Sequence, residues 1–425
     1  MRRCYPNSEE TSRLRWSEGS VSLVMEFRRI TNLPPYVFTI INGLKIEARQ
    51  GGADVIDLGF GNPDLPSPDV AVAKLAEAAK NPRNHRYSLS RGLPRLREEV
   101  AKYYEKTWGV HLDPELEITN TIGSKEGFSH LMWVLLERGD AAIVPTPSYP
   151  IHMYGPLFAG ADLRQLPMRG LSHPDERANF SEEFFDNLHR AYDIGWPKPR
   201  VLVISFPHNP TGACVDLDFM QRVVDFCRER EMIVVHDFAY ADIGFDGVRP
   251  PSILQAEGAK EVAVEQYSMT KSFSMAGWRS AFMVGSAEVV QALVKLKSYL
   301  DYGMFQPVQI AATVAFREAS DYPKEICSIY ESRCDSLIDG LSKIGWDVPK
   351  PGGTMFVWAP IPEAYGEMSS VEFCSMLVKE CDVALSPGVG FGPGGEGYVR
   401  FALIENEQRI AQAMRNLRRG LTKLG

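Results

Sequence analysis

The sequence predicts an α/β protein built on a mostly parallel β-sheet with helices on both faces. Short, almost continuously apolar runs recur, each followed by a turn rich in Pro, Gly or Asn and then by a helical pattern. Such runs are typical of parallel strands, because a strand buried on both faces has no solvent side and so no alternation. The runs are Ala141–Val144, Val201–Ser205, Met232–His236, Val262–Gln266 and Ala281–Val284, with helices expected at Leu217–Glu229 and Ala287–Tyr299.

The length of 425 residues exceeds what one hydrophobic core usually supports, so we expect more than one domain. After Phe305 the pattern changes to an α+β order: a helical stretch Pro307–Lys343 interrupted near Pro323, strand Phe356–Ala359, helix Ser370–Glu380, strands Val383–Ser386 and Tyr398–Leu403, and a last helix. We therefore assign residues 62–305 to a large domain and 306–425 to a smaller one. Residues 26–61 are expected to pack with the smaller domain, and residues 1–25 to be a disordered extension.

Composition and charge exclude several classes of function. The formal net charge is −8, from 46 basic and 54 acidic side chains, which gives no basic footprint for nucleic acid. No apolar run reaches the roughly 18 residues of a membrane span, and the polar first two dozen residues do not resemble a secretory signal. Seven cysteines without a C-x-x-C pair favour a reducing compartment, so we expect a cytoplasmic protein. The histidines show no metal-ligand spacing, so no metal site is predicted.

Polar side chains follow four of the predicted strands. Tyr149 comes shortly after Ala141–Val144, and Asn209 follows the next strand along the chain. Asp237, with Tyr240 soon after, ends the strand that begins at Met232, and Lys271 follows the strand Val262–Gln266. Ligands of open parallel sheets bind beyond the carboxyl ends of the strands. The sequence therefore predicts that an aromatic ring, an amide, a carboxylate and an amine meet at one rim of the sheet.

A further candidate site lies upstream, where a strand at Glu117–Ile122 leads into Gly123-Ser124-Lys125. A helix follows, with Phe128, Leu131, Met132 and Leu135 spaced for one buried face. The free N–H groups and the positive dipole end of such a helix suit a phosphate. Taken alone, the motif favours simple N-capping by Ser124 over phosphate binding, and both interpretations stay open at this point.

Several of these motifs together resemble the pyridoxal 5′-phosphate (PLP)-dependent aminotransferases of class I and II, which have fold type I. The resemblance covers nearly the whole chain from about Phe27 onward. It implies a seven-stranded type of sheet in the large domain, a homodimer with sites at the subunit interface, and small-molecule amino acids and 2-oxo acids as partners. The motifs that carry it are Ser268-x-x-Lys271 with Gly277-Trp278-Arg279, Asn209-Pro210-Thr211-Gly212, Asp237-x-x-Tyr240 and the strand with Arg400.

The resemblance implies a role for each residue that would contact the PLP ring. Lys271 would form a Schiff base with PLP and later act as the base that moves the substrate Cα proton. Asp237 would pair with the pyridine nitrogen and keep it protonated. Asn209 and Tyr240 would hydrogen-bond the phenolic oxygen, and Tyr149 would stack on the ring.

It also implies residues for the cofactor phosphate and for the substrate. Ser268, Arg279 and Ser124, with the N–H of Lys125, would hold the phosphate, and Tyr87 resembles the tyrosine that reaches it from the neighbouring subunit. Arg400 would grip the substrate α-carboxylate in a two-bond fork, together with Asn209. Gly61 resembles the glycine of the loop beside the substrate, and Tyr36 is a candidate to close over it. Without the resemblance, Arg400 reads as a solvent-facing strand arginine and Tyr36 as a packed aromatic.

Within the group, the segments Leu33–Phe38, Ile122–Gly127, Tyr149–His152 and Phe401–Asn406 look most like bacterial glutamate–pyruvate (alanine) aminotransferases. The sequence therefore predicts a ping-pong exchange between L-alanine and 2-oxoglutarate. Aspartate and LL-diaminopimelate aminotransferases share many of these sequence motifs and remain alternatives, as does a PLP-dependent lyase. A PLP-binding regulator is disfavoured, because the segment before Phe27 is too short and irregular for a DNA-binding domain.

Two other motifs are rejected. Ser268-x-x-Lys271 matches the nucleophile motif of penicillin-binding proteins, but the S-D-N and K-T-G partners of that motif do not occur. Gly390-x-Gly392-x-x-Gly395 matches the dinucleotide fingerprint by letters only. It leads into a strand, whereas the fingerprint opens a helix, so a flexible glycine loop is expected there.

Overall fold

The computed structural model describes residues 27, 33, 37–168 and 179–424. The chain divides into two units, Met1–Tyr36 and Val37–Gly425, and the helices and strands given below lie in the second unit. No helix among the described residues is long and apolar enough to cross a membrane.

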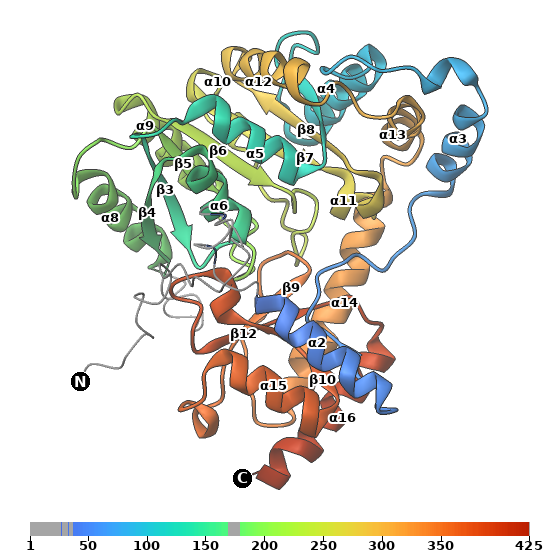
Figure 1. Ribbon diagram of the computed structural model, residues 1–425, viewed down its shortest axis with the longest axis vertical. Helices are drawn as coiled ribbons and strands as arrows, with labels where there is room; N and C mark the ends of the chain where they lie inside the picture. Colours follow the sequence, from blue (N-terminus) through green and yellow to red (C-terminus); the bar gives the residue numbers. More distant parts are fainter. Residues whose placement is uncertain (1–26, 28–32, 34–36, 169–178, 425) are drawn as a thin grey trace, which may run out of the picture. The chain divides into compact units, whose positions relative to one another are not determined.

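A seven-stranded sheet forms the centre of the large domain, in the order β2-β8-β7-β6-β5-β3-β4 (Figure 1). Strand β8 runs antiparallel to both of its neighbours, and the other pairs are parallel. The predicted α/β class and mostly parallel sheet are therefore confirmed. The strands are β2 (Ile118–Ile122), β3 (Ala141–Thr146), β4 (Asp162–Pro167), β5 (Val201–Ile204), β6 (Ile233–Phe238), β7 (Ala263–Ser268) and β8 (Ser280–Gly285).

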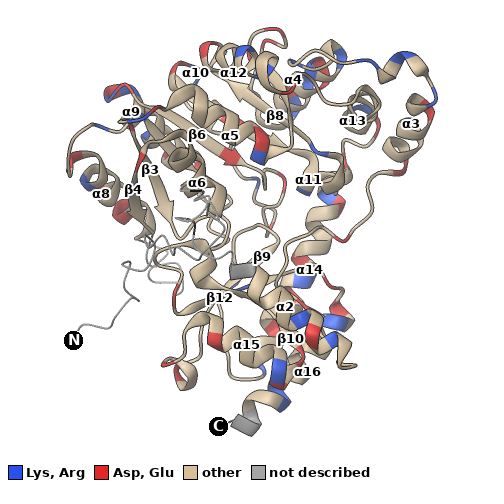
Figure 2. Ribbon diagram, viewed as in Figure 1, with Lys and Arg blue, Asp and Glu red and all other residues tan. Residues whose placement is uncertain are grey.

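Both faces of this sheet are buried, which explains the unbroken apolar runs. Ile143 packs into one hydrophobic core while its neighbours Ala142 and Val144 pack into another, as the alternation of side chains along a strand requires. Figure 2 shows the charged residues mainly on the helices and loops around the strands. The first core includes residues of α3 (Asp69–Ala79), α4 (Pro94–Trp108), α8 (Phe180–Asp193), α9 (Leu217–Glu229), α10 (Ala259–Val262) and α13 (Gln306–Glu318). The second includes α5 (Ser124–Leu135), α6 (Pro150–Ala159) and α12 (Ala287–Leu300).

Helix α9 has the bounds that its sequence pattern predicts. Asp216 caps it, since its side chain accepts a hydrogen bond from the N–H of Phe219 at 2.8 Å. Phe219, Val223 and Val224 are among the residues that form its buried face. The cap fixes the first turn and the apolar stripe fixes the face that meets the sheet.

A smaller α+β domain is built mainly from the C-terminal part of the chain around its own hydrophobic core. Strands β11-β12-β9 form an antiparallel sheet, and β1 pairs in parallel with β10. Helix α2 packs against α15 in this domain. The elements are α2 (Val37–Gln50), β1 (Ile56–Asp57), α14 (Tyr322–Ser342), β9 (Phe356–Pro360), α15 (Ser370–Cys381), β10 (Val383–Ala384), β11 (Ser386–Pro387), β12 (Tyr398–Ala402) and α16 (Glu407–Leu424).

One sequence prediction in this domain is wrong in detail. The single strand expected at Val383–Ser386 is two short strands, β10 and β11, because the chain passes from one sheet to the other at Leu385. The loop expected at Gly390–Gly395 starts at the end of a 3-10 turn, Gly388–Phe391, and continues to Gly395 without helix or strand. The other short helices are α11 (Met269–Ser272) and the 3-10 turns Pro82–His85, Ile253–Gln255, Ala276–Trp278 and Glu363–Tyr365.

Candidate active site

Lys271 lies in α11, the short helix that follows β7 directly. Its Nζ donates a hydrogen bond to the carbonyl oxygen of Gly61 at 3.0 Å and lies 6.0 Å from the centroid of the Tyr240 ring. The side chain is half-buried, and the pKa of its amine is lowered to about 7, first by burial and then by the positive charges of Arg400 and Arg279. Near neutral pH a large share of this amine is therefore unprotonated and nucleophilic.

Gly61 is a glycine because the loop passes very close to an aromatic ring. A Cβ built on Gly61 would lie 2.5 Å from Cζ of Phe356, which leaves no room for any side chain. It would also lie 3.7 Å from Nη2 of Arg400. The loop can therefore bring the Gly61 carbonyl to Lys271 only in the absence of a side chain.

Asp237, near the end of β6, is buried and belongs to a chain of three polar groups. Its Oδ2 lies 2.8 Å from Nε2 of His152, and Nδ1 of His152 lies 2.9 Å from the Ser148 hydroxyl oxygen. A carboxylate only accepts hydrogen bonds, so the arrangement fits an imidazole that donates from Nε2 and accepts from the serine at Nδ1. The aromatic rings of Phe128 and Tyr149 pack against the imidazole at centroid distances of 5.3 and 5.8 Å.

Sequence reasoning gave His152 and Ser148 no role. Ser148 directly precedes the predicted site residue Tyr149, and His152 follows three positions after it. Both therefore come shortly after the end of β3. This shared position is the one signal in the sequence that pointed to them. Their partner Asp237 is 85 residues away from His152 in the sequence, so the contact itself depends on the fold.

Arg400, on β12, is 5% exposed, so the alternative of a solvent-facing strand arginine is wrong. Its Nη1 donates to Oδ1 of Asn209 at 2.8 Å, and its Nη2 donates to the carbonyl oxygen of Gly59 at 3.2 Å. The guanidinium carbon lies 3.8 Å from the centroid of the Phe356 ring. The turn after β5, the loop at Gly59 and the small sheet thus hold one buried cation at the site.

The first turn of α5 does not have the predicted serine cap. The N-cap residue is Gly123, with φ of 79°, and no side chain bonds the free N–H groups, so N-capping by Ser124 is wrong. Ser124 is instead the first helical residue. A Cβ on Gly123 would lie 2.0 Å from Nη2 of Arg279, which means that the guanidinium rests against the start of the helix. Free N–H groups and a cation therefore meet at one point, as an anion site requires.

Ser268 caps α11 by accepting a hydrogen bond from the N–H of Thr270 at 3.2 Å, and its hydroxyl proton remains available as a donor. Tyr149 and Tyr240 keep their phenolic protons near neutral pH. Burial, followed by the charge of Asp237, raises the pKa of Tyr149 to about 12. Burial also raises the pKa of Tyr240 well above its ordinary value. The Lys125 ammonium lies 5.4 Å from the Tyr149 ring centroid.

Two of the expected site residues are not among these contacts. Tyr87 is 87% exposed, and its ring lies 5.2 Å from that of Tyr302 on the surface of the large domain. Tyr36 lies outside the described residues.

The donor set fits PLP, the cofactor that the resemblance implies. The site combines an amine of low pKa, a buried carboxylate, two phenolic donors and an anion site at a helix start. These are the groups that an aldehyde, a pyridine nitrogen, a phenolic oxygen and a phosphate need. The fit of the phosphate follows from Gly123, where the absence of a Cβ leaves room for Arg279 beside the free N–H groups.

Comparison with known proteins identifies the family. Residues 53–417 match the family model of aminotransferase class I and II. The chain is 47% identical over 393 residues to the glutamate-pyruvate aminotransferase AlaC of Escherichia coli, covering 92% of this chain and 93% of the relative. It is 41% identical over 401 residues to an LL-diaminopimelate aminotransferase of Moorella thermoacetica, covering 94% of this chain and all of the relative.

The solved structures agree with the sequence comparisons. Substrate-bound BacF from Bacillus subtilis superposes with a TM-score of 0.86 at 34% identity, covering 93% of this chain and 98% of BacF. An N-succinyldiaminopimelate aminotransferase from Mycobacterium tuberculosis gives a TM-score of 0.83 at 27% identity, covering 93% and 99% of the two chains. The chain thus belongs to the class I and II aminotransferases, a PLP-dependent family of fold type I.

Proposed function

We propose that this aminotransferase exchanges an amino group between L-alanine and 2-oxoglutarate in a ping-pong reaction. The observation that carries the choice of alanine is the 47% identity to a glutamate-pyruvate aminotransferase over 92% of the chain. Arg400 and Arg279 are the two cations that lower the pKa of the Lys271 amine, and we assign Arg400 to the substrate α-carboxylate and Arg279 to the cofactor phosphate.

In this proposal the start of α5 holds the cofactor phosphate. The Ser124 hydroxyl and the N–H groups of Ser124 and Lys125 donate to it, and the positive end of the helix dipole favours its negative charge. Arg279 adds a charge-assisted hydrogen bond, and Ser268 donates its hydroxyl proton. The Arg279 side chain is exposed in the structure, so it can turn toward an incoming anion from its place beside Gly123.

Lys271 acts twice in the reaction that we propose. With PLP bound, its unprotonated amine would hold the cofactor, and the same amine, once free, would remove the proton from the substrate Cα. When bound, PLP supplies an electron sink for the negative charge that this proton transfer leaves on Cα. Asp237, held by His152, would pair with the pyridine nitrogen of the bound cofactor. Tyr240 would donate a hydrogen bond to the phenolic oxygen of the cofactor.

Arg400 and Asn209 orient the substrate. The guanidinium carbon already lies 3.8 Å from the centroid of the Phe356 ring, and one of its nitrogens is bonded to Asn209, so its fork is fixed before a substrate arrives. An α-carboxylate gains two parallel hydrogen bonds there, which sets the direction of the Cα–H bond relative to Lys271. Because the Oδ1 of Asn209 accepts from Arg400, its amide nitrogen is the donor that is left for the cofactor phenolic oxygen.

We also propose that the protein is a homodimer in which Tyr87 reaches the phosphate of the partner subunit. The large domain exposes several large apolar side chains, and the rings of two of them, Tyr87 and Tyr302, lie 5.2 Å apart. Exposed apolar surface is typical of an interface between subunits. The other exposed apolar residues near them in the sequence are Leu89, Tyr299 and Phe305. The six cysteines among the described residues are free thiols, which supports a location in the reducing cytoplasm.

A donor–acceptor screen on the purified protein tests the choice of substrate. Alanine, aspartate, glutamate and LL-diaminopimelate are each combined with pyruvate or 2-oxoglutarate, and initial rates are measured. We expect the highest kcat/KM for alanine with 2-oxoglutarate and parallel lines in double-reciprocal plots. A preference for LL-diaminopimelate, which the 41% identity to enzymes of that name favours as the second candidate, would overturn the alanine assignment.

Lys271→Ala tests the site itself. Turnover and the visible absorption of the bound cofactor are both expected to disappear, because the substitution removes the amine that would hold the cofactor and act as the base. Wild-type activity in this variant would refute the role of Lys271. Product analysis separates transfer from lyase chemistry, since a lyase releases ammonia with the 2-oxo acid.

A further inference from the structure

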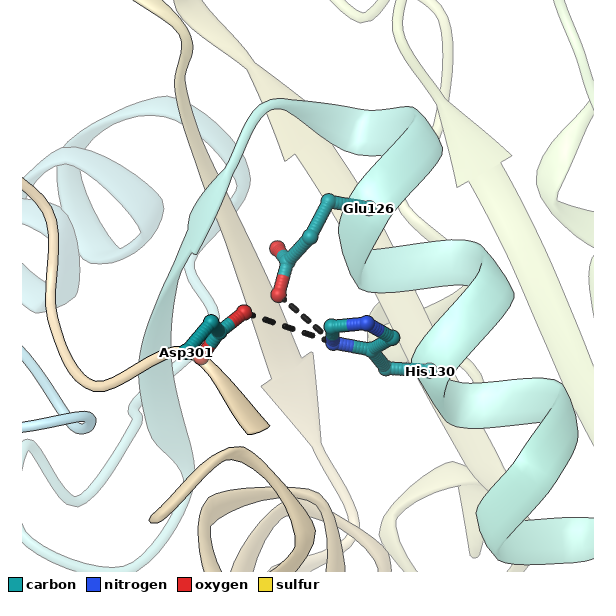
Figure 3. A group of neighbouring side chains, drawn as sticks. All are labelled: Glu126, His130 and Asp301. Atoms are coloured by element: carbon teal, nitrogen blue, oxygen red, sulfur yellow. Dashed lines mark ion pairs between the residues drawn. The ribbon is translucent and has the colours of Figure 1, made fainter. Parts of the chain in front are cut away.

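Four ionisable side chains form a cluster beside the first turns of α5. Glu126 and His130 come from α5, and Asp301 follows α12 (Figure 3). Lys297, on α12, is 1% exposed. Its Nζ lies 2.5 Å from Oε1 of Glu126 and 3.1 Å from both carboxylate oxygens of Asp301.

Glu126 is held from two sides. Its Oε2 accepts a hydrogen bond at 2.7 Å from the N–H of Ile122, the last residue of β2. Its Oε1 meets the Lys297 ammonium and lies 2.7 Å from Nδ1 of His130. Burial acts to raise the pKa of Glu126, but the hydrogen bonds and the ammonium lower it to about 2. The carboxylate thus ties the end of β2, an edge strand of the large sheet, to α12.

A metal ion is a weaker explanation of the same cluster. The ligand atoms of Glu126, His130 and Asp301 lie within 4.8 Å of one another, as a cation site requires. The Lys297 ammonium, however, already lies among these oxygens and supplies the positive charge. A divalent cation would have to displace a buried lysine, so the cluster is an ion-pair network.

We propose that Lys297 is a positioning residue for the cofactor phosphate, acting through Glu126 on the first turn of α5. The proposal rests on the proposed function, because that function assigns the phosphate to the N–H groups of Ser124 and Lys125. Glu126 is the next residue in the same turn, so its attachment to β2 and α12 fixes the direction in which those N–H groups point. Lys297 does not touch the phosphate and acts only through this turn.

Loss of the ammonium would change the turn in a defined way. The carboxylates of Glu126 and Asp301 would then face each other without the cation between them, and like charges at this distance repel. Removing one partner of a buried ion pair leaves an uncompensated charge, which is strongly unfavourable. The turn would relieve the repulsion by moving Glu126, and the free N–H groups would move with it.

The test compares two aldehydes that differ only in the phosphate, PLP and pyridoxal. Dissociation constants of both are measured on the full chain after removal of the cofactor, for the wild type, Lys297→Met and Lys295→Met. Lys295 is an exposed lysine two residues away on the same helix and is the matched control. We expect Lys297→Met to weaken PLP by about tenfold or more and pyridoxal by less than about twofold, with no change in the control.

The ratio of the affinities for PLP and pyridoxal distinguishes a positioning role of Lys297 from a general loss of folding at the site. An equal loss for both aldehydes, or no loss for either, would overturn the proposal. Lys297→Arg keeps the charge and should retain most of the PLP preference. If Lys297→Met does not fold, Asp301→Asn gives the answer, because it weakens the same network without removing the buried ammonium. A preference lowered severalfold in Asp301→Asn supports the proposal, and an unchanged preference overturns it.

Ser124→Ala distinguishes this proposal from the proposed function. If Ser124→Ala lowers the preference for PLP over pyridoxal while the Lys297 and Asp301 variants keep it, Lys297 has no positioning role and the phosphate assignment stands. If Ser124→Ala and Gly123→Ala also keep the preference, the start of α5 does not bind the phosphate. Both proposals are then overturned.

Discussion

The amine of Lys271 should lose its reactivity toward an aldehyde as the pH falls through about 7, more than three pH units below the range of an ordinary lysine. Burial is the largest cause of the low pKa, and the cations of Arg400 and Arg279 add to it. All three disfavour the protonated form. The sign is therefore fixed: the amine is neutral and reactive above this pH and protonated and inert below it.

The size of the effect follows from the same value. With a pKa of about 7, the neutral fraction of the amine rises from about 10% at pH 6 to about 90% at pH 8 and then levels off. An ordinary lysine with a pKa of about 10.4 has well under about 1% neutral amine at pH 8, and its reactivity climbs about tenfold per pH unit up to pH 9. The two cases differ in the shape of the profile and not only in its height.

The assay mixes the cofactor-free protein rapidly with pyridoxal and follows the visible absorption between pH 6 and 9.5. A small primary amine, measured over the same range, corrects for the ionisation of the aldehyde. Lys271→Ala gives the background from surface lysines. A corrected rate that still rises tenfold per unit through pH 9 would refute the reasoning, because it would mean that neither burial nor the two arginines act on this amine.

Three further predictions concern the surrounding groups. Arg400→Lys should raise the KM for the amino donor by about 10- to 100-fold, because an ammonium cannot form the two-bond fork; steady-state kinetics check this, and an unchanged KM contradicts the carboxylate assignment. Gly123→Ala should speed the loss of PLP on dilution and cost about 1–2 kcal/mol of stability, since the residue has φ of 79° and its new Cβ meets Arg279. Arg333→Met should lower the free energy of unfolding by about 1–2 kcal/mol, because it leaves Asp64 without its two-bond partner at 2.8 Å; an unchanged urea midpoint would contradict it.

The set of residues at the sheet rim was predictable because a parallel sheet brings strand ends together. Asn209, Asp237 and Lys271 follow neighbouring strands, β5, β6 and β7, so the connection of the sheet implies that they are close. Apolar runs fixed where the strands lie, and no long-range information was needed. The prediction of the rim therefore follows from local sequence and one rule of topology.

Contacts between distant parts of the chain were not predictable in this way. Arg400 and Asn209 are separated by 191 residues, and Lys271 and the Gly61 carbonyl by 210. Their pairing depends on how the small sheet packs on the large one, which no local pattern encodes. The error at Ser124 has a local cause: a glycine with positive φ took the cap position, and serine moved one place into the helix. A serine after a glycine therefore fits both interpretations until the backbone is known.

The two arginines link the state of Lys271 to what occupies the site. Arg279 and Arg400 both lower the pKa of the amine while their charges face it, which keeps the amine neutral for the attack on the cofactor. In our assignment a phosphate then neutralises Arg279 and a substrate carboxylate neutralises Arg400. Each anion removes one cause of the low pKa, so the affinity of the amine for a proton rises as the site fills. A lysine that first serves as a nucleophile thus becomes a stronger base when the substrate Cα–H is in position.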